Sequence, residues 1–406
     1  MDYQETVDWL YNQLPFYQKS GAIAYKKDIN NVVNFFKKNG QDFLCFDTIH
    51  VGGTNGKGSV SHMLSSIIQE SGLKVGLFTS PHLLDFRERI TINGDMITTD
   101  FIVDFVTQHM QDFKNMNMSF FEMNFVMACK YFTTQDVDLA IIEVGLGGRL
   151  DATNVISPIL SIITNTSLDH KDVLGDSLDL ITQEKAGIIK QNTPILIGQD
   201  NDSIQIIHDQ ALKLNSPIFF AKQHNFKSDL KGHYQVHNIN ISVTAIDILN
   251  NLNYKISAEN ITNGLANVRE NTGFRGRWDI LSKQPLVVCD IAHNIDSFNH
   301  ILLQLTTYKH EKHLILGFSK GKDYNSILEI LPKDYHYYVC GSSNERIINP
   351  RELSISFDQH NLSYKTFDSS SIAYTYLCGN SNKNDLILIT GSTFIVSDML
   401  KFLDKS

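Results

Sequence analysis

The sequence has few cysteines, and they form no recognisable pattern. The five cysteines are odd in number, scattered along the chain and without a Cys-x-x-Cys pair. Four of them stand in apolar surroundings, which is typical of buried thiols that behave as small apolar side chains. We therefore expect neither a disulfide framework nor a cysteine-based metal site. The cysteines are Cys45, Cys129, Cys289, Cys340 and Cys378.

Segments typical of secreted and membrane proteins are also missing. The N-terminal residues MDYQETVDWL contain no basic region followed by an apolar stretch, so no secretion signal is predicted. No apolar run approaches the ~20 residues that a helix needs to cross a bilayer. From these two absences we expect a soluble, cytoplasmic protein.

Positive charge is likewise scarce. Acidic residues outnumber basic ones by 44 to 35, which gives a formal net charge of −9, and there is no long run of lysine or arginine. Such a chain is a poor candidate for binding nucleic acid through its phosphates or for docking on an anionic membrane. We therefore expect no nucleic-acid partner and no membrane partner.

Apolar residues, in contrast, are plentiful and recur in regular patterns along the chain. A chain of 406 residues exceeds the size at which one core usually stops growing, so two domains are expected. In the first part, short apolar strands alternate with amphipathic helices such as 57–71, 100–113 and 176–189. This alternation indicates a buried parallel sheet in an α/β domain. The predicted strands are 47–53, 74–80, 138–145, 159–165 and 194–198.

A second series of strands and helices follows the segment ENTGFRGRW (270–278). We expect the hinge between the two series in this segment and place the domain boundary near residue 276. Both series resemble doubly wound α/β folds, in which ligands bind at the carboxyl ends of the strands. The predicted strands of the second series are 285–290, 313–318, 335–341, 363–367 and 385–391.

The strongest local motif is IHVGGTNGKGSV, in which an apolar strand runs through a glycine-rich turn into a helix. Gly53, Gly56 and Gly58 let the backbone curl so that its N–H groups point at phosphate oxygens. The start of the helix and Lys57 add positive charge. The spacing differs from the common GxxxxGK[ST], because only two residues separate Gly53 from Gly56 and Gly58 directly follows the lysine. An incidental tight turn before a helix is the alternative interpretation.

Oxygen ligands stand at two further strand ends. Glu143 ends the strand in IIEVGLGGRLDATN, and Ser80 ends the strand in LFTSPHLLDFRERITING. A carboxylate beside a phosphate loop is the hard oxygen ligand that Mg²⁺ prefers, and a serine hydroxyl can join it. The alternatives are that Glu143 caps a turn and that Ser80 begins a Ser-Pro turn.

Several weaker signals follow other strands. His170 and Lys185 would not be singled out alone, since a lone histidine is usually structural and a lone lysine is usually a solvated charge. Asp290 ends a strand, where its carboxylate can accept hydrogen bonds from a ribose. His293 and Asn294 stand at the start of a helix, which they can cap, or they can contact a substrate.

Taken together and in order, these motifs closely resemble the folylpolyglutamate synthase/dihydrofolate synthase family, within the Mur-type ATP-dependent amide ligases. The resemblance runs from about residue 15 to the C-terminus. It implies an ATP-dependent ligase, usually monomeric, that adds L-glutamate to dihydropteroate, to folyl(poly)glutamates, or to both, through an acyl phosphate. The motifs that carry it are GTNGKGS, TSPHL, EVGLGGRLDATN, LDHKDVLG with EKAGIIK, and DIAHN.

The same resemblance implies the fold and the nucleotide site. Residues 1–275 would form a P-loop-type ATPase domain with a mostly parallel sheet, the central domain of Mur ligases. Residues 276–406 would form a smaller Rossmann-like α/β domain that serves glutamate ligation. The implied ATP contacts are Asn55, Gly56, Lys57, Gly58, Ser59, Asn238, Arg277 and Asp290.

Metal and substrate contacts are implied in the same way. Two Mg²⁺ ions would be bound by Ser80, Glu143, His170 and Lys185, the last carbamylated by CO₂ so that it becomes an anionic ligand. The pterin-bearing acid would contact Phe120, Phe121, Glu122, Leu150, Asp151 and Ala152, with help from residues 22–25. His293 and Asn294 would lie near the incoming glutamate. Lys57, Lys185 and His293 are the residues expected to carry the chemistry.

One departure and two rival functions complete the sequence analysis. Ile291 and Ile295 stand where the family usually has the glycine and proline of DGAHNP, which puts the geometry of that turn in question because glycine permits angles that isoleucine does not. The rivals are a Mur-type ligase acting on a peptidoglycan precursor and a non-catalytic ATP-binding regulatory protein. The GTNGKGS loop and the DATN string argue against the first. The combination of phosphate-loop and metal-ligand candidates exceeds what the second needs.

Overall fold

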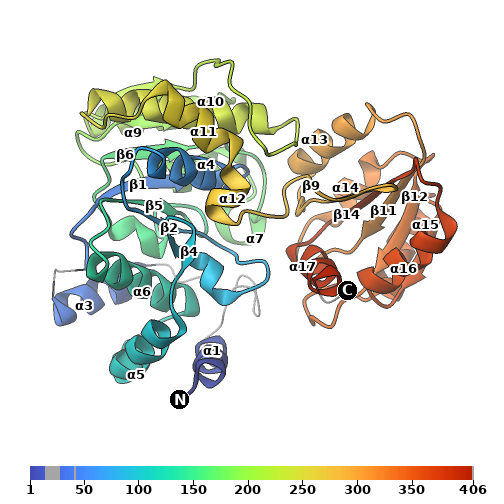
Figure 1. Ribbon diagram of the computed structural model, residues 1–406, viewed down its shortest axis with the longest axis horizontal. Coiled ribbons are helices and arrows are strands. Elements are labelled where there is room, and N and C mark those ends of the chain that lie inside the picture. The colour runs from blue at the N-terminus through green and yellow to red at the C-terminus, as the bar shows by residue number, and fades with distance from the viewer. Residues whose placement is uncertain (14–27, 41–42, 405–406) are drawn as a thin grey trace. The chain divides into compact units, whose positions relative to one another are not determined.

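The chain folds into two compact units, each built on its own sheet (Figure 1). The computed structural model describes residues 1–13, 28–40 and 43–404. The first unit comprises Met1–Asp229 and Gln235–Phe274, and the second comprises Leu230–Tyr234 and Arg275–Ser406.

The sheet of the first unit has the strand order β4-β3-β2-β5-β1-β6-β7-β8. Strands β2, β5, β1, β6, β7 and β8 run parallel to one another, whereas β3 is antiparallel to β2 and to β4. Their carboxyl ends therefore meet at one edge of the sheet. The strands are Asp47–Gly52 (β1), Val75–Phe78 (β2), Ile90–Ile92 (β3), Asp95–Met96 (β4), Leu139–Glu143 (β5), Leu160–Ile163 (β6), Ile195–Ile197 (β7) and Ile218–Phe220 (β8).

Helices cover both faces of this sheet. The central strands β1, β2, β5 and β6 are buried almost throughout, which explains their continuous apolar sequences. Helices α4, α10 and α11 lie over one face, and α5 and α6 lie over the other (Figure 1). These helices span Lys57–Gln69 (α4), Thr99–Asn115 (α5), Phe120–Thr134 (α6), Gln235–Asn251 (α10) and Ala258–Ala266 (α11).

Shorter helices complete the first unit, and aromatic side chains fill the core beside α5 and α6. The ring of Phe35 stacks on that of Phe113 and contacts Phe43 and Phe105 edge-on or at a tilt. Each such ring buries a large apolar area and stabilises the unit by roughly 1.5–3 kcal/mol. The remaining elements are Tyr3–Asn12 (α1), Asn30–Asn39 (α3), Phe86–Arg89 (η2), Ala152–Val155 (η3), Lys171–Leu174 (α7), Leu178–Ala186 (α8), Ile204–Lys213 (α9) and Val268–Thr272 (α12).

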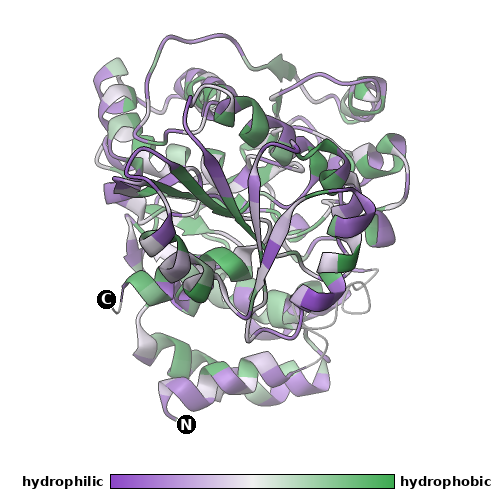
Figure 2. Ribbon diagram, turned by 90° about the vertical axis from the view of Figure 1, so that its right-hand side faces the viewer, coloured by the Kyte–Doolittle hydropathy of each residue, from purple (hydrophilic) through white to green (hydrophobic). Residues whose placement is uncertain are grey.

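The second unit is a smaller α/β layer structure with the strand order β13-β12-β11-β14-β10-β9. All neighbours are parallel except β9, which pairs antiparallel with β10. Figure 2 shows helices with alternating hydrophobic and hydrophilic stretches. The elements of the second unit are Asp279–Lys283 (β9), Leu286–Cys289 (β10), Ile295–Leu305 (α13), Lys312–Leu316 (β11), Tyr324–Ile330 (α14), His336–Cys340 (β12), Pro350–Gln359 (α15), Tyr364–Phe367 (β13), Ser370–Asn380 (α16), Leu386–Thr390 (β14) and Thr393–Leu403 (α17).

The predicted fold class, two α/β parts with mostly parallel sheets, is confirmed. Each of the ten predicted strands overlaps an observed one, and no strand end differs by more than two residues. The sequence pattern did not predict β3, β4, β8 and β9, three of which have only two or three residues. In the described part of the chain, no helix is both long enough and apolar enough to cross a membrane.

Close packing of α11 on α4 makes Gly264 sensitive to substitution. A methyl group at Gly264 would lie 2.7 Å from the backbone nitrogen of Ile67 and 2.8 Å from the carbonyl oxygen of Ser66. We predict that Gly264→Ala lowers the free energy of unfolding by about 1–3 kcal/mol, because the two helices must separate.

Gly379→Ala is the control. Gly379 lies in α16 with nothing within 4 Å of an added methyl group. Alanine should there stabilise by about 0.5–1 kcal/mol. Urea denaturation followed by circular dichroism measures both, and equal effects would contradict the packing argument.

Candidate active site

The site residues predicted in the first unit lie around the carboxyl ends of four neighbouring strands. In the sheet order, β2, β5, β1 and β6 are adjacent. The loop after β1 leads into α4, the loop after β2 contains Ser80, β5 ends at Glu143, and the segment after β6 contains His170. Segments far apart in the sequence thus meet at one edge, as expected for ligand binding in an α/β sheet.

Glycine conformations shape the loop between β1 and α4. Gly53 has a φ of 142° and packs so closely on the Thr164 hydroxyl that a side chain would clash there. Gly56 has a left-handed backbone with a φ of 84° and immediately precedes the first residue of α4. Gly56 places no side chain over the start of α4. The first amides of α4 point toward the loop and can bind an anion.

Lys57 lies across this loop. Its Nζ donates hydrogen bonds to the carbonyl oxygens of Gly53 at 3.0 Å and of Thr54 at 3.2 Å. The ammonium group is therefore held above the curled backbone. This is where a phosphate loop requires a positive charge.

Residues after β6 hold the loop in place. The backbone N–H of Asn55 donates to Oδ1 of Asn165 at 2.8 Å, and the Thr164 hydroxyl donates to the carbonyl oxygen of Asn55 at 2.6 Å. The Thr54 amide donates to the carbonyl oxygen of Asn165 at 3.0 Å. Thr164 and Asn165 were not singled out from the sequence, although polar residues at the end of a predicted strand were a usable signal.

A buried polar network connects the start of α4 with α10. Nδ2 of Asn238 donates to Oε1 of Gln235 at 2.7 Å, and Nε2 of Gln235 donates to the Ser59 hydroxyl at 3.2 Å. A methyl group at Gly56 would lie 2.5 Å from Oδ1 of Asn238. The structure therefore brings the predicted nucleotide residues Ser59 and Asn238 together, with Gln235 as a link that the sequence did not indicate.

Glu143 and Ser80 are neighbours. The backbone N–H of Ser80 donates to Oε2 of Glu143 at 2.9 Å. A methyl group at Gly58 would lie 3.7 Å from Oε1 of Glu143, so the carboxylate also borders the start of α4. Glu143 is buried. This carboxylate thus stands between the phosphate loop and the loop after β2, where a cation can be held.

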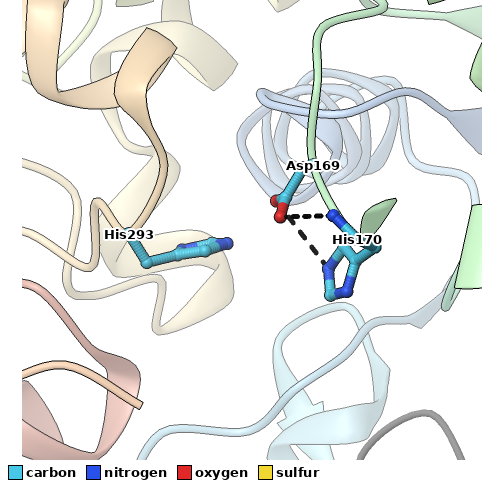
Figure 3. Close-up of side chains that lie close together, drawn as sticks. All are labelled: Asp169, His170 and His293. Atoms are coloured by element: carbon cyan, nitrogen blue, oxygen red, sulfur yellow. Dashed lines mark hydrogen bonds and ion pairs between the residues drawn. The ribbon is translucent and has the colours of Figure 1, made fainter. Parts of the chain in front are cut away.

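His170 lies after β6, next to Asp169 (Figure 3). It has a left-handed backbone with a φ of 51° and immediately precedes α7. Oδ1 of Asp169 accepts a hydrogen bond from the His170 amide at 2.7 Å, and its Oδ2 lies 3.7 Å from Nε2 of His170. Asp169 was not singled out from the sequence, although an acid directly before the histidine was visible in LDHKD. Carboxylate and imidazole form a pair suited to a divalent cation.

Lys185 is a buried basic residue near this edge. Its side chain lies at the end of α8 and is 3% exposed. Burial lowers the pKa of the Lys185 ammonium to about 7. The positive charge of Lys57 lowers it further, and Asp169 opposes the shift. Because both groups act on Lys185 electrostatically, Lys185 shares one field with the phosphate loop and with Asp169. A large fraction of this lysine is uncharged at neutral pH.

The predicted acid-binding residues of α6 have structural contacts of their own. The Phe120 ring is buried and stacks on Tyr11, with centroids 5.1 Å apart. Glu122 forms a capping box with Ser119, whose amide donates to Oε2 of Glu122 at 2.6 Å. A methyl group at Gly145 would lie 2.5 Å from the Phe121 ring, so this aromatic wall packs on the turn after β5.

Asp151 stabilises that turn. Its carboxylate accepts hydrogen bonds from the amides of Leu146 at 2.9 Å and Thr153 at 3.0 Å, and from the Thr153 hydroxyl. Burial raises the pKa of Asp151, and these hydrogen bonds oppose the shift. Leu150 is half-buried and Ala152 is buried on either side of it. The predicted contacts at residues 22–25 lie outside the described residues.

In the second unit, Asp290 collects three donors at the end of β10. It accepts hydrogen bonds from the Tyr234 hydroxyl at 2.5 Å and from the amides of Trp278 at 2.8 Å and Ala292 at 3.0 Å. Burial raises the pKa of Asp290, and the charge of Arg277 opposes the shift. Tyr234 was not singled out from the sequence, although it lies four residues before Asn238.

The turn after Asp290 accommodates isoleucine. Ile291 and Ile295 are not among the residues with positive φ, so neither position needs the conformational freedom of glycine. Asn294 caps α13 by accepting a hydrogen bond from the Ser297 amide at 2.9 Å. Nδ1 of His293 lies 3.0 Å from the carbonyl oxygen of Ile291 and donates to it, so Nε2 is the acceptor nitrogen of the neutral ring.

The arrangement of these side chains points to one class of protein. A phosphate loop, a buried carboxylate, a histidine and a buried lysine meet at one sheet edge, and a second α/β unit follows. Family models agree: residues 51–266 match the Mur ligase middle domain, and residues 276–393 match the Mur ligase, glutamate ligase domain. The protein is therefore a Mur-type ligase.

Individual relatives narrow the family. The dihydrofolate synthase/folylpolyglutamate synthase of Buchnera aphidicola (subspecies Acyrthosiphon pisum) is 30% identical over 86% of this chain and 88% of its own length. A probable bifunctional folylpolyglutamate synthase/dihydropteroate synthase of Haloferax volcanii is 28% identical over 98% of this chain, which spans only 50% of that longer protein. The chain belongs to the dihydrofolate synthase/folylpolyglutamate synthase family.

A solved structure supports the same conclusion. The crystal structure of bifunctional folylpolyglutamate synthase/dihydrofolate synthase from Yersinia pestis CO92 superposes with a TM-score of 0.86 at 25% sequence identity. The similarity covers 100% of this chain and 98% of that one. The likeness therefore extends over both units and not over the phosphate-loop segment alone.

Gly56 offers a direct test of the phosphate loop. Gly56→Ala places a methyl group against Asn238 and strains a left-handed backbone, so we predict at least tenfold weaker ATP binding. Gly72→Ala is the matched control, because Gly72 has a similar φ of 87° and nothing within 4 Å of an added methyl group. Both variants should lose about 1–2 kcal/mol of stability. Calorimetric titration with a non-hydrolysable ATP analogue distinguishes them, and equal ATP affinities would refute the assignment of this loop.

Proposed function

We propose that this protein joins L-glutamate to the carboxylate of dihydropteroate, of folyl(poly)glutamates, or of both, using ATP. The convergence of the phosphate loop, Glu143, His170 and Lys185 at one sheet edge carries this proposal. A site that only bound ATP would not need this set of acidic, imidazole and buried amine groups. Membership of the family supports a folate-type acid and glutamate as the substrates.

Nucleotide and metal binding follow from the same groups. A bifunctional folylpolyglutamate synthase/dihydrofolate synthase from Yersinia pestis has been solved with AMPPNP and a manganese ion. Here the Ser80 hydroxyl, the Glu143 carboxylate and His170 offer mainly hard donors, which fit Mg²⁺. When bound, such ions would neutralise the phosphates and stabilise the transferring phosphoryl group. We propose that these residues and Lys185 hold two ions.

Carbamylation of Lys185 explains why a lysine belongs to that set. An amine reacts with CO₂ only in its uncharged form, and burial keeps much of Lys185 uncharged. The neutral amine nitrogen forms a bond to the carbon of CO₂ and releases one proton, so the uncharged side chain becomes an anion. The carbamate would then offer oxygen ligands beside Glu143 and His170. It would also remove the repulsion between Lys185 and Lys57.

The residues of the loop position the reacting groups. Lys57 and the first amides of α4 hold the terminal phosphates, which lowers the repulsion between ATP and the approaching carboxylate. A carboxylate oxygen then forms a bond to the terminal phosphorus as the bond to ADP breaks, which gives an acyl phosphate. The glutamate amine, after losing a proton, attacks the acyl carbon, and phosphate leaves. We propose that Arg277 and Asp290 contact the nucleotide and that His293 and Asn294 contact glutamate.

Release of ADP tests the proposed reaction. With Mg²⁺-ATP, L-glutamate and either dihydropteroate or a reduced folate monoglutamate, we expect ADP release that requires both the acid and glutamate. Coupling to pyruvate kinase and lactate dehydrogenase measures the rate. Turnover with both acids would show a bifunctional enzyme, and turnover with one would identify its step. ATP binding without stimulation by either acid would refute the folate assignment.

Lys185→Ala tests the carbamate. We expect at least a hundredfold loss of turnover, because a ligand that stabilises the transition state is removed, and partial recovery with added acetate. Lys213→Ala, on the exposed face of α9, is the control and should retain full activity. Carbon-13 NMR with labelled bicarbonate should show a carbamate signal in the wild-type protein that is absent from the variant. Undiminished activity of Lys185→Ala would contradict the assignment.

A further inference from the structure

Arg89 is a buried cation beside the site that none of the roles above uses. It ends the short helix η2 and directly precedes β3. Its carbonyl oxygen accepts a hydrogen bond from the Thr79 amide at 3.0 Å, which places Arg89 next to the loop that contains Ser80. Its side chain is only 2% exposed.

The guanidinium of Arg89 has no carboxylate partner among residues 1–13, 28–40 and 43–404. There its one hydrogen bond runs from Nε to Nδ1 of His82 at 2.7 Å, and its Cζ lies 5.1 Å from the Phe120 ring centroid. Its neighbour Arg87 differs, since it pairs with Asp85 through Nη2 at 2.7 Å and lies more exposed. Two arginines on one short helix thus have opposite environments.

The hydrogen bond to His82 fixes the orientation of this cation. An arginine Nε–H can only donate, so Nδ1 of His82 accepts and the ring proton lies on Nε2. Nε2 lies 3.2 Å from the Tyr11 hydroxyl and donates to it. The Tyr11 ring in turn stacks on Phe120. Within the described ranges the two Nη groups have no hydrogen-bond partner, so they can bind another ligand.

Burial has not removed the charge of Arg89. It lowers the pKa of the guanidinium to about 10, while Tyr11, Glu143 and Glu88 oppose the shift from a distance. The side chain is therefore protonated at neutral pH. A buried charge that no described carboxylate neutralises is unfavourable, and a bound anion that pairs with it offsets that cost. Functional sites are where such a cost is usually found.

The order of the strands indicates which of the two anionic reactants, the ATP phosphates or the carboxylate of the acid, can reach Arg89. The phosphate loop follows β1, and Glu143 ends β5. Arg89 lies beside the carboxyl end of β2 and at the start of β3. Because β5 lies between β1 and β2, Glu143 separates the phosphate loop from Arg89. Arg89 also borders Phe120, a predicted contact of the acid substrate. We therefore expect the anion that reaches Arg89 to belong to the acid, and the ATP phosphates to bind on the other side of Glu143.

We propose that Arg89 binds the substrate carboxylate that is converted to the acyl phosphate, an inference that rests on the proposed function. The planar guanidinium matches a carboxylate, and a buried setting strengthens the pair. When one carboxylate oxygen forms its bond to phosphorus and ADP leaves, the other oxygen remains as the carbonyl of the acyl phosphate. Arg89 keeps its hydrogen bond to that oxygen and exchanges no proton. It thereby lowers the repulsion between the two anions.

Binding measurements with a matched pair of ligands test this proposal. One ligand is the acid that supports ADP release in the wild-type protein, and the other is its neutral carboxamide. Calorimetry in the presence of a non-hydrolysable ATP analogue measures both dissociation constants. We expect Arg89→Gln to weaken acid binding about 10- to 100-fold, as for a lost charged hydrogen bond. Binding of the carboxamide should change less than about threefold, and binding of the ATP analogue less than about twofold.

Three further variants separate this role from a structural one. Arg87→Gln, the matched control on the same helix, should leave the preference for acid over carboxamide intact. Arg89→Lys should keep part of that preference, because it retains the charge without the planar fork. Arg89→Met should melt within a few degrees of the wild type in the absence of ligand, since a buried charge without a carboxylate partner adds little stability.

The possible outcomes are distinct. If the wild type releases ADP with the acid but Arg89→Gln still prefers acid over carboxamide, the inference about Arg89 is wrong and the proposed function stands. Equal weakening of the acid and the ATP analogue would assign Arg89 to the phosphates and overturn the inference. Failure of both Arg89→Lys and Arg89→Met to fold would show a structural arginine. Absence of acid-dependent ADP release in the wild type would overturn the proposed function and this inference together.

Discussion

Parallel pairing of β2, β5, β1 and β6 is the constraint on which the site depends. These strands are short and apolar, and their register is fixed by backbone hydrogen bonds such as those that align Phe78 with Ile142 and Val51 with Glu143. Their carboxyl ends therefore coincide. Loops from four distant parts of the sequence are thereby brought within reach of one ligand, without any direct link between them in the chain.

Charge at this edge is arranged for anionic ligands. Lys57 and the start of α4 provide positive charge at the phosphate loop, and Arg89 adds a buried cation, whereas burial keeps much of Lys185 uncharged. A reaction that joins a carboxylate to a terminal phosphate must bring two anions together. Carbamylation would turn Lys185 into an anion that holds metal ions, whereas Arg89 would keep its charge and pair with the substrate. The two buried basic side chains thus have different proposed roles at this edge of the sheet.

Much of the fold follows from sequence pattern, because buried parallel strands are continuous apolar runs and glycines mark the turns after them. The positions of Gly53, Gly56, Lys57 and Glu143 at strand ends were readable for the same reason. Contacts through space were not. Gln235 and Asn165 act by hydrogen bonds across 176 and 110 residues, and no local pattern reports such a pairing. The environment of Arg89 depends on which face of η2 is buried, which four residues cannot reveal.

Transfer of oxygen-18 tests the central claim, that the acid is activated as an acyl phosphate. The acid is prepared with both carboxylate oxygens labelled and is converted with Mg²⁺-ATP and L-glutamate. If a carboxylate oxygen forms the bond to the terminal phosphorus, each phosphate released should contain one oxygen-18 atom, and mass spectrometry will detect it. Unlabelled phosphate, with product formed at the normal rate, would contradict an acyl phosphate and with it the proposed roles of Lys57, Lys185 and Arg89.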